Sequence, residues 1–387
     1  MPQTSERARL SRDRPTWLIY LQLGAFATYL YGLSAAVPLL RIDERTSAAV
    51  AGLHGTAMAV ATIAAGLALP FLTGRYGRRT VTWLGVAGMN AGVVLVVFSS
   101  SLPFTLLGYA VAGGFGSLML YAAMAALSDH HGPAGAAAIT EANAVGVVIG
   151  SSVTFLISAM ANTALGWRAA LLVTPLLTLA VAAALGRVWT SAPAPPPERV
   201  LDPAPGPGWR FHVSGAVLCC CVALEFSFNL WAASLLAART GLSVATAATG
   251  LSALIAGMAA GRFAGAQLAL RVPHTRLFTG ALAVAGAGWL IFWMATEPVL
   301  GYAGLALSGL GISLHFPLAL SAMIGNSGGR PDLAAAASPM WAGAAMAVGP
   351  FVLGALADGF GTRTAFLLVP VLIGLAVGGV LTARRRS

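Results

Sequence analysis

The chain has 387 residues, of which 58% are hydrophobic and only 9% are charged. Soluble domains carry a charge on roughly a quarter of their residues, so this composition excludes a water-soluble globular protein. The formal net charge is +10, and all 22 basic residues are arginines. They lie in short loops and at the chain ends and form no basic helical face, so we expect membrane topology rather than a nucleic-acid partner.

The apolar residues form twelve long runs, each long enough for a helix to cross a hydrocarbon core of roughly 30 Å. The runs cover residues 16–40, 47–73, 80–100, 102–128, 137–160 and 169–188, followed by 211–238, 244–268, 277–296, 299–325, 334–357 and 365–383. The first run is too long for a signal peptide and is interpreted as a spanning helix. The sequence therefore predicts an all-α membrane protein with twelve transmembrane helices.

The arginines also predict how these helices are oriented. Sixteen arginines fall on the side of the N-terminus and five on the other side, while Arg262 lies within a helix. Because short cytoplasmic loops carry the excess of basic residues, both termini are predicted to be cytoplasmic. We expect a multi-pass protein of the bacterial cell (inner) membrane, in contact with the lipid bilayer.

A proline-rich segment divides the chain in the middle. Residues 191–209 contain seven prolines, and such a stretch is extended and cannot continue a helix. The predicted domains are therefore an N-terminal six-helix bundle at 1–190, a cytoplasmic linker at 191–209 and a C-terminal six-helix bundle at 210–387.

The two halves also carry an internal repeat. Residues 166–175 and 361–370 match at five positions with an offset of 195. The same offset relates two glycine pairs, Gly114 with Gly116 and Gly309 with Gly311. Parallel repeats of six helices, related by an axis along the membrane normal, are the plan of one large class of secondary transporters.

The loop at residues 74–79 reads Gly-Arg-Tyr-Gly-Arg-Arg. It resembles the acid-Arg-x-Gly-Arg-Arg signature between helices two and three of the major facilitator superfamily, and the helix count, linker and repeat extend the resemblance over the whole chain. It implies two helical bundles around a central cavity, working by alternating access. It also implies a gating loop made of Arg75, Gly77, Arg78 and Arg79.

The sequence departs from this family in three places. Gly74 stands where the signature has its acid, and the second-half copy at 271–274 has Leu270 in that place. Tyr109 stands where many members have an arginine in helix four. The fifth segment, around Gly150, lacks the proline typical of drug antiporters of the family, so export and uptake are left equally open.

Ionisable side chains inside a membrane are costly and are therefore candidates for function. Glu225 lies in the middle of the seventh segment, and Asn229 follows one turn later on the same face. His315 lies in the tenth segment beside Pro317, whose ring kinks a helix. We interpret Glu225 and His315 as proton-coupling groups, and all three side chains as substrate contacts. Structural hydrogen bonding is the alternative.

Two more charged residues are gating candidates, and three aromatic residues are candidates for the cavity wall. Glu141 begins the fifth segment, and Arg262 lies on a helix with glycines at 257, 261 and 265, which predict close packing against a partner helix. Tyr29, Tyr121 and Trp341 are the predicted substrate-binding aromatic residues, with simple packing as the alternative.

The predicted function is secondary active transport of a small molecule, coupled to protons. The alternatives are an uncoupled facilitator or a transporter-like receptor or sensor. We expect no enzyme, because no nucleophile–base pair or phosphate-binding loop is present. No cofactor or metal site is expected, since the neighbours His130 and His131 are interpreted as solvated, and the protein is expected to be a monomer.

Overall fold

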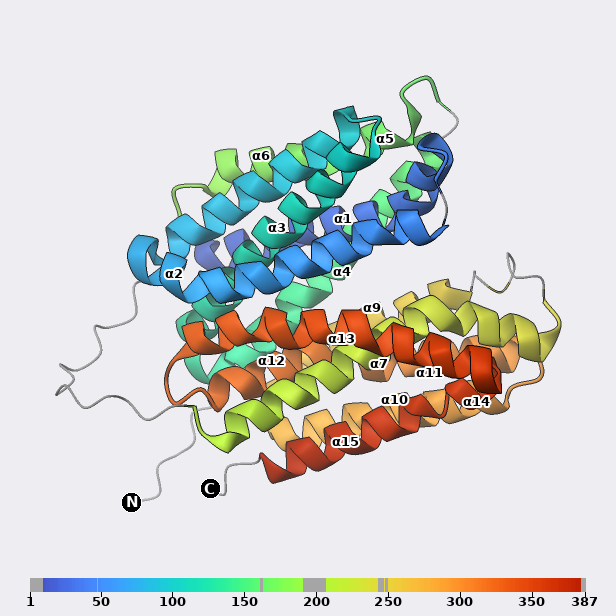
Figure 1. Cartoon of the computed structure of the whole chain (residues 1–387). Helices are drawn as coiled ribbons and strands as arrows, with labels where there is room; N and C mark the ends of the chain where they lie inside the picture. Colours follow the sequence, from blue (N-terminus) through green and yellow to red (C-terminus); the bar gives the residue numbers. More distant parts are fainter. Residues whose placement is uncertain are drawn as a thin grey trace, which may run out of the picture. The chain divides into compact units, whose positions relative to one another are not determined.

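The structure is a computed structural model that describes residues 10–46, 48–160, 163–190, 207–242, 247 and 250–383. The elements within these residues are helices and none is a strand, which confirms the all-α class. Most of the proline-rich linker predicted at 191–209 lies outside the described residues. The chain forms two compact units, which we describe separately (Figure 1).

The N-terminal unit comprises Ser11–Glu198 together with Pro331–Gly343. Its helices are α1 (Arg14–Asp43), α2 (Ala48–Phe98), α3 (Leu102–His131), the 3-10 turn η1 (Gly132–Ala134), α4 (Gly135–Met160), α5 (Gly166–Ala170), α6 (Val173–Leu185) and the first part of α13 (Pro331–Phe360). Within the unit, α2 packs along α3 and α1 packs along α4 (Figure 1).

Helix α2 contains two of the predicted segments, joined at a bend. Gly77 has φ 75° and ψ 157° inside the otherwise helical stretch, a conformation that glycine adopts at little cost and other residues rarely adopt. The predicted loop between the second and third segments is therefore reduced to this bend. The backbone conformation at this bend therefore explains why the loop signature has a glycine at position 77.

The C-terminal unit comprises Arg199–Arg330 and Ala344–Ser387. Its helices are α7 (Trp209–Thr240), α9 (Gly250–Ala269), α10 (His274–Met294), α11 (Pro298–Ile312), α12 (His315–Gly325), the rest of α13, α14 (Thr362–Ala365) and α15 (Leu368–Thr382). Helix α11 packs against α9 and α10, and α7 packs against α15 and α12. Three fully buried phenylalanines, Phe228, Phe292 and Phe366, stack edge to face or tilted in its core.

The internal repeat is visible in the backbone. Gly166 and Gly361 both have positive φ, at 70° and 81°, and each stands at the start of a short helix, α5 or α14. Both short helices end after a few residues, and a longer helix follows, α6 or α15, with a proline as its third residue. The matched sequences therefore fold into the same broken helix in both units.

The glycine stripe of α9 confirms the predicted close packing. A Cβ atom on Gly257 would collide with the backbone of Ala306 in α11, and one on Gly261 would collide with Ser313. A Cβ on Gly265 would meet Leu314. Only small residues allow two membrane helices to approach so closely.

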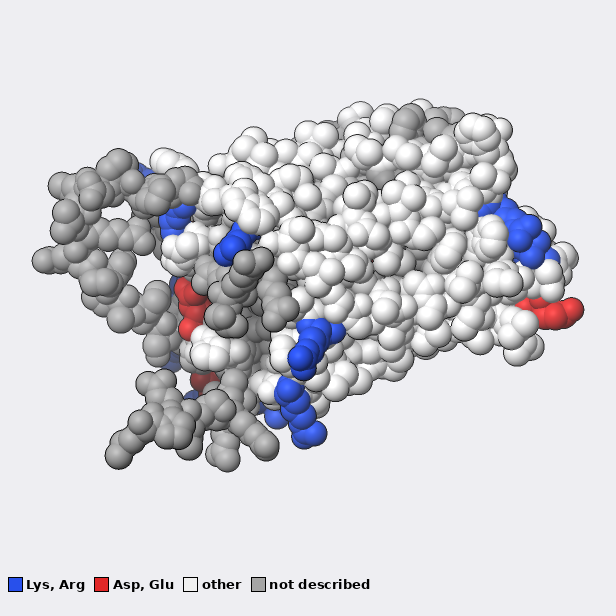
Figure 2. Space-filling model, turned by 90° about the horizontal axis from the view of Figure 1, so that it is seen from below, with Lys and Arg blue, Asp and Glu red and all other residues white. Residues whose placement is uncertain are grey.

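The helices are suited to a membrane. Eight helical stretches among the described residues are long and apolar enough to span one. Figure 2 shows charged side chains gathered at the two ends of the face it displays, with uncharged surface between them. The uncharged band is the surface expected to contact lipid.

Candidate functional site

Arg78, predicted as a gating residue, is held by two carboxylates within the N-terminal unit. Its Nη1 donates to Asp129 Oδ2 at 2.7 Å, and its Nε and Nη2 donate to the two oxygens of Asp332 at 2.6 and 3.0 Å. The Arg78 side chain is only 16% exposed. A two-pronged arginine–carboxylate pair is among the strongest hydrogen-bonding arrangements in proteins, so Arg78 joins the bend of α2 to the ends of α3 and α13.

Neither carboxylate was singled out from the sequence. Gly74 removes the acid of the loop signature, yet Asp332 supplies a carboxylate from α13, a segment about 250 residues later in the chain. The signal was available, because an acidic residue in the first turn of a helix, directly after Pro331, is a favoured helix start. Sequence spacing does not reveal that this start meets Arg78.

The other predicted gating residues of the loop do not share this site. Arg79 donates to the backbone carbonyls of Gly186 and Arg187 at 3.2 and 3.3 Å. Arg75 is exposed and lies over the ring of Tyr76, 5.7 Å from its centre. The three arginines of the signature therefore have three different partners.

Glu141, the gating candidate at the start of the fifth segment, pairs with Arg12 at the start of α1. Arg12 Nε donates to Glu141 Oε1 at 2.6 Å, and Nη2 donates to Oε2 at 3.2 Å. The hydrogen bond and the negative charge of Glu141 raise the pKa of the Arg12 guanidinium above its usual value. The pair connects α1 to α4, whose lengths pack together in the same unit.

The predicted cavity aromatics fall in the N-terminal unit. Tyr29 and Tyr121 are 3% and 4% exposed and lie close enough to interact electrostatically. The hydroxyl of Tyr29 donates to the sulfur of Met58 at 3.7 Å, and its ring covers Gly116. Trp341 lies half-buried on the part of α13 that belongs to this unit. The two tyrosines are therefore neighbours on facing helices.

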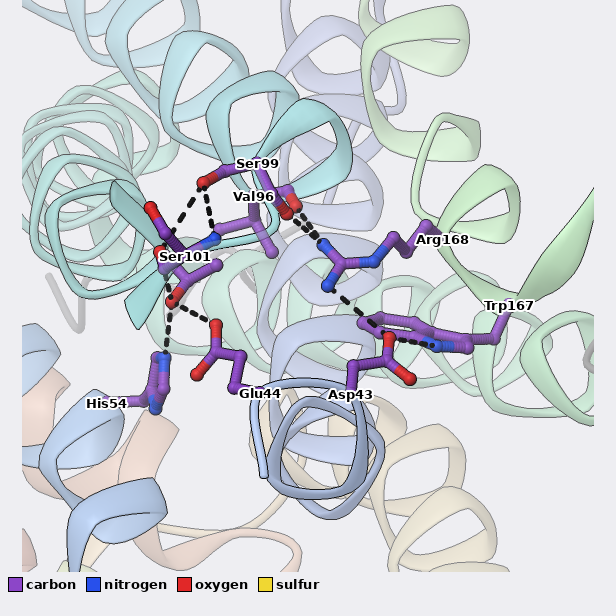
Figure 3. A network of polar contacts seen from close by, with 9 residues as sticks. Asp43, Glu44, His54, Val96, Ser99, Ser101, Trp167 and Arg168 are labelled. Carbon is purple, nitrogen blue, oxygen red and sulfur yellow. Dashed lines mark hydrogen bonds and ion pairs between the residues drawn. The ribbon is translucent and has the colours of Figure 1, made fainter. Parts of the chain in front are cut away.

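A second polar network, which the sequence did not predict, lies at the opposite end of these helices (Figure 3). Arg168 Nη1 donates to the carbonyls of Val96 and Ser99 at 2.7 and 2.6 Å, and Nη2 approaches Asp43 at 3.4 Å. The indole of Trp167 donates to the same carboxylate at 3.2 Å. The Gly-Trp-Arg sequence at residues 166–168 thereby ties α5 to the ends of α1 and α2.

The same network contains a buried histidine. His54 Nδ1 donates to the Ala51 carbonyl at 2.9 Å, and Nε2 lies 3.0 Å from the Thr105 hydroxyl, which donates to Glu44 at 2.7 Å. The Thr105 hydroxyl therefore connects His54 of α2 to Glu44 at the end of α1.

The C-terminal unit brings Glu225 and Arg262 together in its interior. Arg262, on α9, is 6% exposed and is close enough to Glu225, on α7, for their charges to interact. Its Nε also donates to the backbone carbonyl of Ser313 at 3.3 Å. Two residues predicted for different roles, proton coupling and gating, thus interact: the half-buried Glu225 and the buried Arg262.

The carbonyl that receives Arg262 is available because of Pro317. Proline has no N–H, and its ring displaces the carbonyl four residues earlier, which is that of Ser313. The predicted kink accordingly lies at Ser313 and Leu314, between α11 and α12, rather than at the proline itself. Pro317 therefore contributes to the site because it leaves the Ser313 carbonyl free to accept a hydrogen bond from Arg262.

His315 begins α12 and is completely buried. Its ring packs against Phe278 at 6.4 Å between centres, near the carbonyl of Ala281. Within the described part of the chain, neither ring nitrogen has a partner in hydrogen-bonding geometry. A buried polar group in this state needs an explanation such as a catalytic, transport or water-binding role. Asn229 lies half-buried, one turn after Glu225.

The comparisons with known proteins agree with these features. Several helices are long enough to span a membrane. Their charged residues lie mostly at the helix ends or interact with an opposite charge, which is typical of a multi-pass membrane protein. A family model of the Major Facilitator Superfamily matches residues 16–338. The chain belongs to this superfamily and is a membrane transporter. No curated protein sequence matches it significantly.

Solved structures match the fold over nearly the whole chain. The Escherichia coli fucose:proton symporter FucP, in its outward conformation, matches with a TM-score of 0.82 at 15% identity, over 96% of this chain and 99% of that one. The human organic anion transporter MFSD10 matches with a TM-score of 0.77 at 16% identity, covering 96% and 100%. The proton:xylose symporter XylE matches with 0.74 at 12% identity, covering 95% of each.

Proposed function

We propose that the chain is a proton-coupled secondary transporter that moves a small molecule by alternating access across a bacterial inner membrane, with both termini in the cytoplasm. The observation that carries the proposal is the interaction of the half-buried Glu225 with the buried Arg262 in the C-terminal unit. A carboxylate inside a membrane protein is costly to keep ionised. It is therefore well placed to exchange a proton during transport.

Protonation of Glu225 changes the balance of charge in this pair. The ionised carboxylate attracts Arg262 in an environment of low dielectric constant, where such attraction is much stronger than in water. A proton on Glu225 removes the attraction, whereas the hydrogen bond from Arg262 Nε to the Ser313 carbonyl does not depend on that charge. Arg262 then favours a different arrangement of α7 and α9. The coupling equals the difference in proton affinity between the two states.

The proposed substrate-binding residues are Asn229 and His315 in the C-terminal unit and Tyr29, Tyr121 and Trp341 in the N-terminal unit. A buried imidazole with unsatisfied nitrogens can bind a hydroxyl or carboxylate group. Among the similar structures are symporters of fucose and of xylose and an organic anion transporter. Sugars and organic acids are therefore the first substrates to test.

One observation favours an uncoupled facilitator instead. Arg262 already compensates the charge of Glu225, so the pair can remain ionised throughout the transport cycle and serve only to hold α7 against α9. In that case Glu225 exchanges no proton, and substrate moves down its own gradient alone.

The test is proton movement in proteoliposomes that enclose a pH-sensitive dye. Wild type, Glu225→Gln and Glu297→Gln are challenged with sugars, organic acids and cationic drugs. Glu297 is an exposed carboxylate just before α11, without a side-chain capping bond, and serves as the matched control. We expect one compound to drive proton flux in wild type and Glu297→Gln but not in Glu225→Gln.

Substrate counterflow in the same vesicles separates the alternatives, because exchange of labelled for unlabelled substrate needs no proton gradient. Retained counterflow in Glu225→Gln, together with lost proton flux, supports coupling through Glu225. Equal substrate entry in all three proteins, without proton movement in any, establishes the facilitator and contradicts the proposal.

A further inference from the structure

Three potential metal ligands meet where α1 begins and α3 ends, within the N-terminal unit. One ligand atom each from Asp13, His130 and His131 lies within 4.8 Å of the other two. His130 Nε2 is 2.7 Å from Asp13 Oδ2, and His131 Nε2 is 2.8 Å from the hydroxyl of Thr16. The two imidazoles and one carboxylate come from segments more than 100 residues apart in the chain.

The end of helix α3 explains how two adjacent histidines share one site. Neighbouring side chains within a helix diverge by about 100°, which is why the sequence predicts a solvated pair. Here His130 and His131 occupy the last turn, and Gly132 leaves the helix with φ 50°. Their rings lie 4.9 Å apart at 79° to each other. Both rings therefore reach the Asp13 side of the helix end.

Asp13 is fixed in place for this arrangement. It is the N-cap of α1, where Oδ1 accepts from the Thr16 backbone N–H at 3.0 Å and from the Thr16 hydroxyl at 2.5 Å. Oδ1 holds the cap, so Oδ2 is the oxygen that faces the histidines.

We propose that Asp13, His130 and His131 form a binding site for a zinc ion. Two imidazoles with one carboxylate are a ligand set that zinc prefers, with water as the fourth ligand. Zinc bonds of about 2.0–2.2 Å place tetrahedral ligand atoms roughly 3.3–3.6 Å apart. The side chains need to move by only about 1 Å to reach that spacing. Thr16 then acts as the group that orients the carboxylate.

The surrounding charges favour a cation. The last turn of α3 presents the negative end of the helix dipole to the histidines. The carboxylates of Asp13 and Glu141 both act on His131, while Arg12 offsets one of these charges through its pair with Glu141. The Asp13 side chain is 40% exposed and that of His130 is 16% exposed, so an ion can enter from solvent.

The experiment is zinc binding to the full chain in detergent, purified without a histidine tag and washed with chelator. Isothermal titration calorimetry is carried out with Zn²⁺ and, separately, Mg²⁺. We expect one zinc per chain and no magnesium, because Mg²⁺ selects oxygen ligands. Replacing Zn²⁺ by Co²⁺ should give the visible absorption of a cobalt ion with nitrogen and oxygen ligands.

Asp13→Asn is the informative variant, because asparagine caps a helix as well as aspartate but is a much poorer zinc ligand. Asp13→Asn and the double variant His130→Ala/His131→Ala should each weaken zinc binding roughly tenfold or more. His212→Ala, which removes an exposed histidine of α7, is the control and should bind as wild type does.

The proposal is overturned if the wild type binds no zinc, or if Asp13→Asn and the double histidine variant bind zinc as tightly as the wild type. Loss of binding in His212→Ala also overturns it. The measurement involves no transport, so its result is independent of whether Glu225 couples protons. Thermal unfolding of each variant without metal establishes that the variants are folded.

Discussion

The two units differ in where their interacting charged residues lie. The N-terminal unit keeps its ion pairs at the ends of its helices, as in Arg12 with Glu141 and Arg78 with Asp129 and Asp332. The C-terminal unit has two interacting charged residues away from its helix ends, the half-buried Glu225 and the buried Arg262. End pairs are partly hydrated and cost little, whereas a buried charge costs several kcal/mol unless it is compensated.

The contrast suggests a division of work between the repeats. Pairs at helix ends can hold a bundle together or join it to a neighbouring segment, and they change little when one proton is gained. A buried pair is sensitive to a single proton, because its two members depend on each other. We therefore expect substitutions in the C-terminal pair to have the largest effects and those in the end pairs to have smaller ones.

The strongest test of the comparison is Arg262→Ala. Removing one partner of a buried pair leaves an uncompensated charge, which costs about 3–5 kcal/mol, and the close packing of α9 against α11 adds to the disturbance. We expect a large fall in the midpoint of thermal unfolding in detergent and loss of transport. The double variant Glu225→Gln/Arg262→Ala should recover part of that stability. No recovery would mean that the two charges do not interact.

The next effect in size is expected for Arg78→Ala in the N-terminal unit. It removes three charge-assisted hydrogen bonds, but Asp332 is 43% exposed and Asp129 30% exposed, so water screens the loss. We expect a cost of about 1–2 kcal/mol in thermal unfolding. Arg78→Lys should recover little of it, because an ammonium group cannot bind a carboxylate with two prongs.

Asp332→Asn and Asp129→Asn separate the two contacts of Arg78. Asp332 receives two bonds and Asp129 one, so Asp332→Asn should have the larger effect. The reverse order would show that the contact with α13 contributes little to stability.

Much of the fold could be predicted because long runs of apolar residues identify membrane-spanning helices directly. Long apolar runs indicate helices, and the repeated Gly-x-Arg sequence at residues 166–168 and 361–363 indicates the same backbone arrangement in both units. The breaks within the helices were harder to place. Pro317 predicts a kink, but the displaced carbonyl lies four residues earlier, so the break falls at Ser313.

The site could be predicted only in part, because side-chain partners depend on which helices pack together. Glu225 and His315 could be predicted as candidates because each is an ionisable residue within an apolar segment. The free-energy cost of placing such a side chain in a membrane follows from the sequence alone. The pairing of Glu225 with Arg262 was not visible, nor was that of Arg78 with Asp332. Asp13 is 117 residues from His130, and no spacing rule relates them.

The repeat itself offers a third test, through Arg168 and its counterpart Arg363. Both guanidinium groups lie over a tryptophan ring, at 4.8 and 4.4 Å from its centre. Arg168 also donates to two backbone carbonyls and approaches Asp43. We expect Arg168→Ala to cost about 1–2 kcal/mol and Arg363→Ala about 0.5–1 kcal/mol. Equal shifts in thermal unfolding would mean that the network of Figure 3 contributes no stability beyond the ring contact.

The smallest effect is expected for Arg12→Gln, which removes the ion pair with Glu141. Arg12 is 44% exposed, so its pair with the 14% exposed Glu141 is screened by solvent. The loss should be below about 1 kcal/mol. It should also shrink when thermal unfolding is repeated at high salt, because ions screen exposed charges beyond roughly 3 Å at 1 M. The cost of Arg262→Ala should hardly change with salt, since a buried pair is shielded from ions. A large loss of stability in Arg12→Gln that does not change with salt would show that the N-terminal unit also depends on an unscreened ion pair. The difference between the two units would then be contradicted.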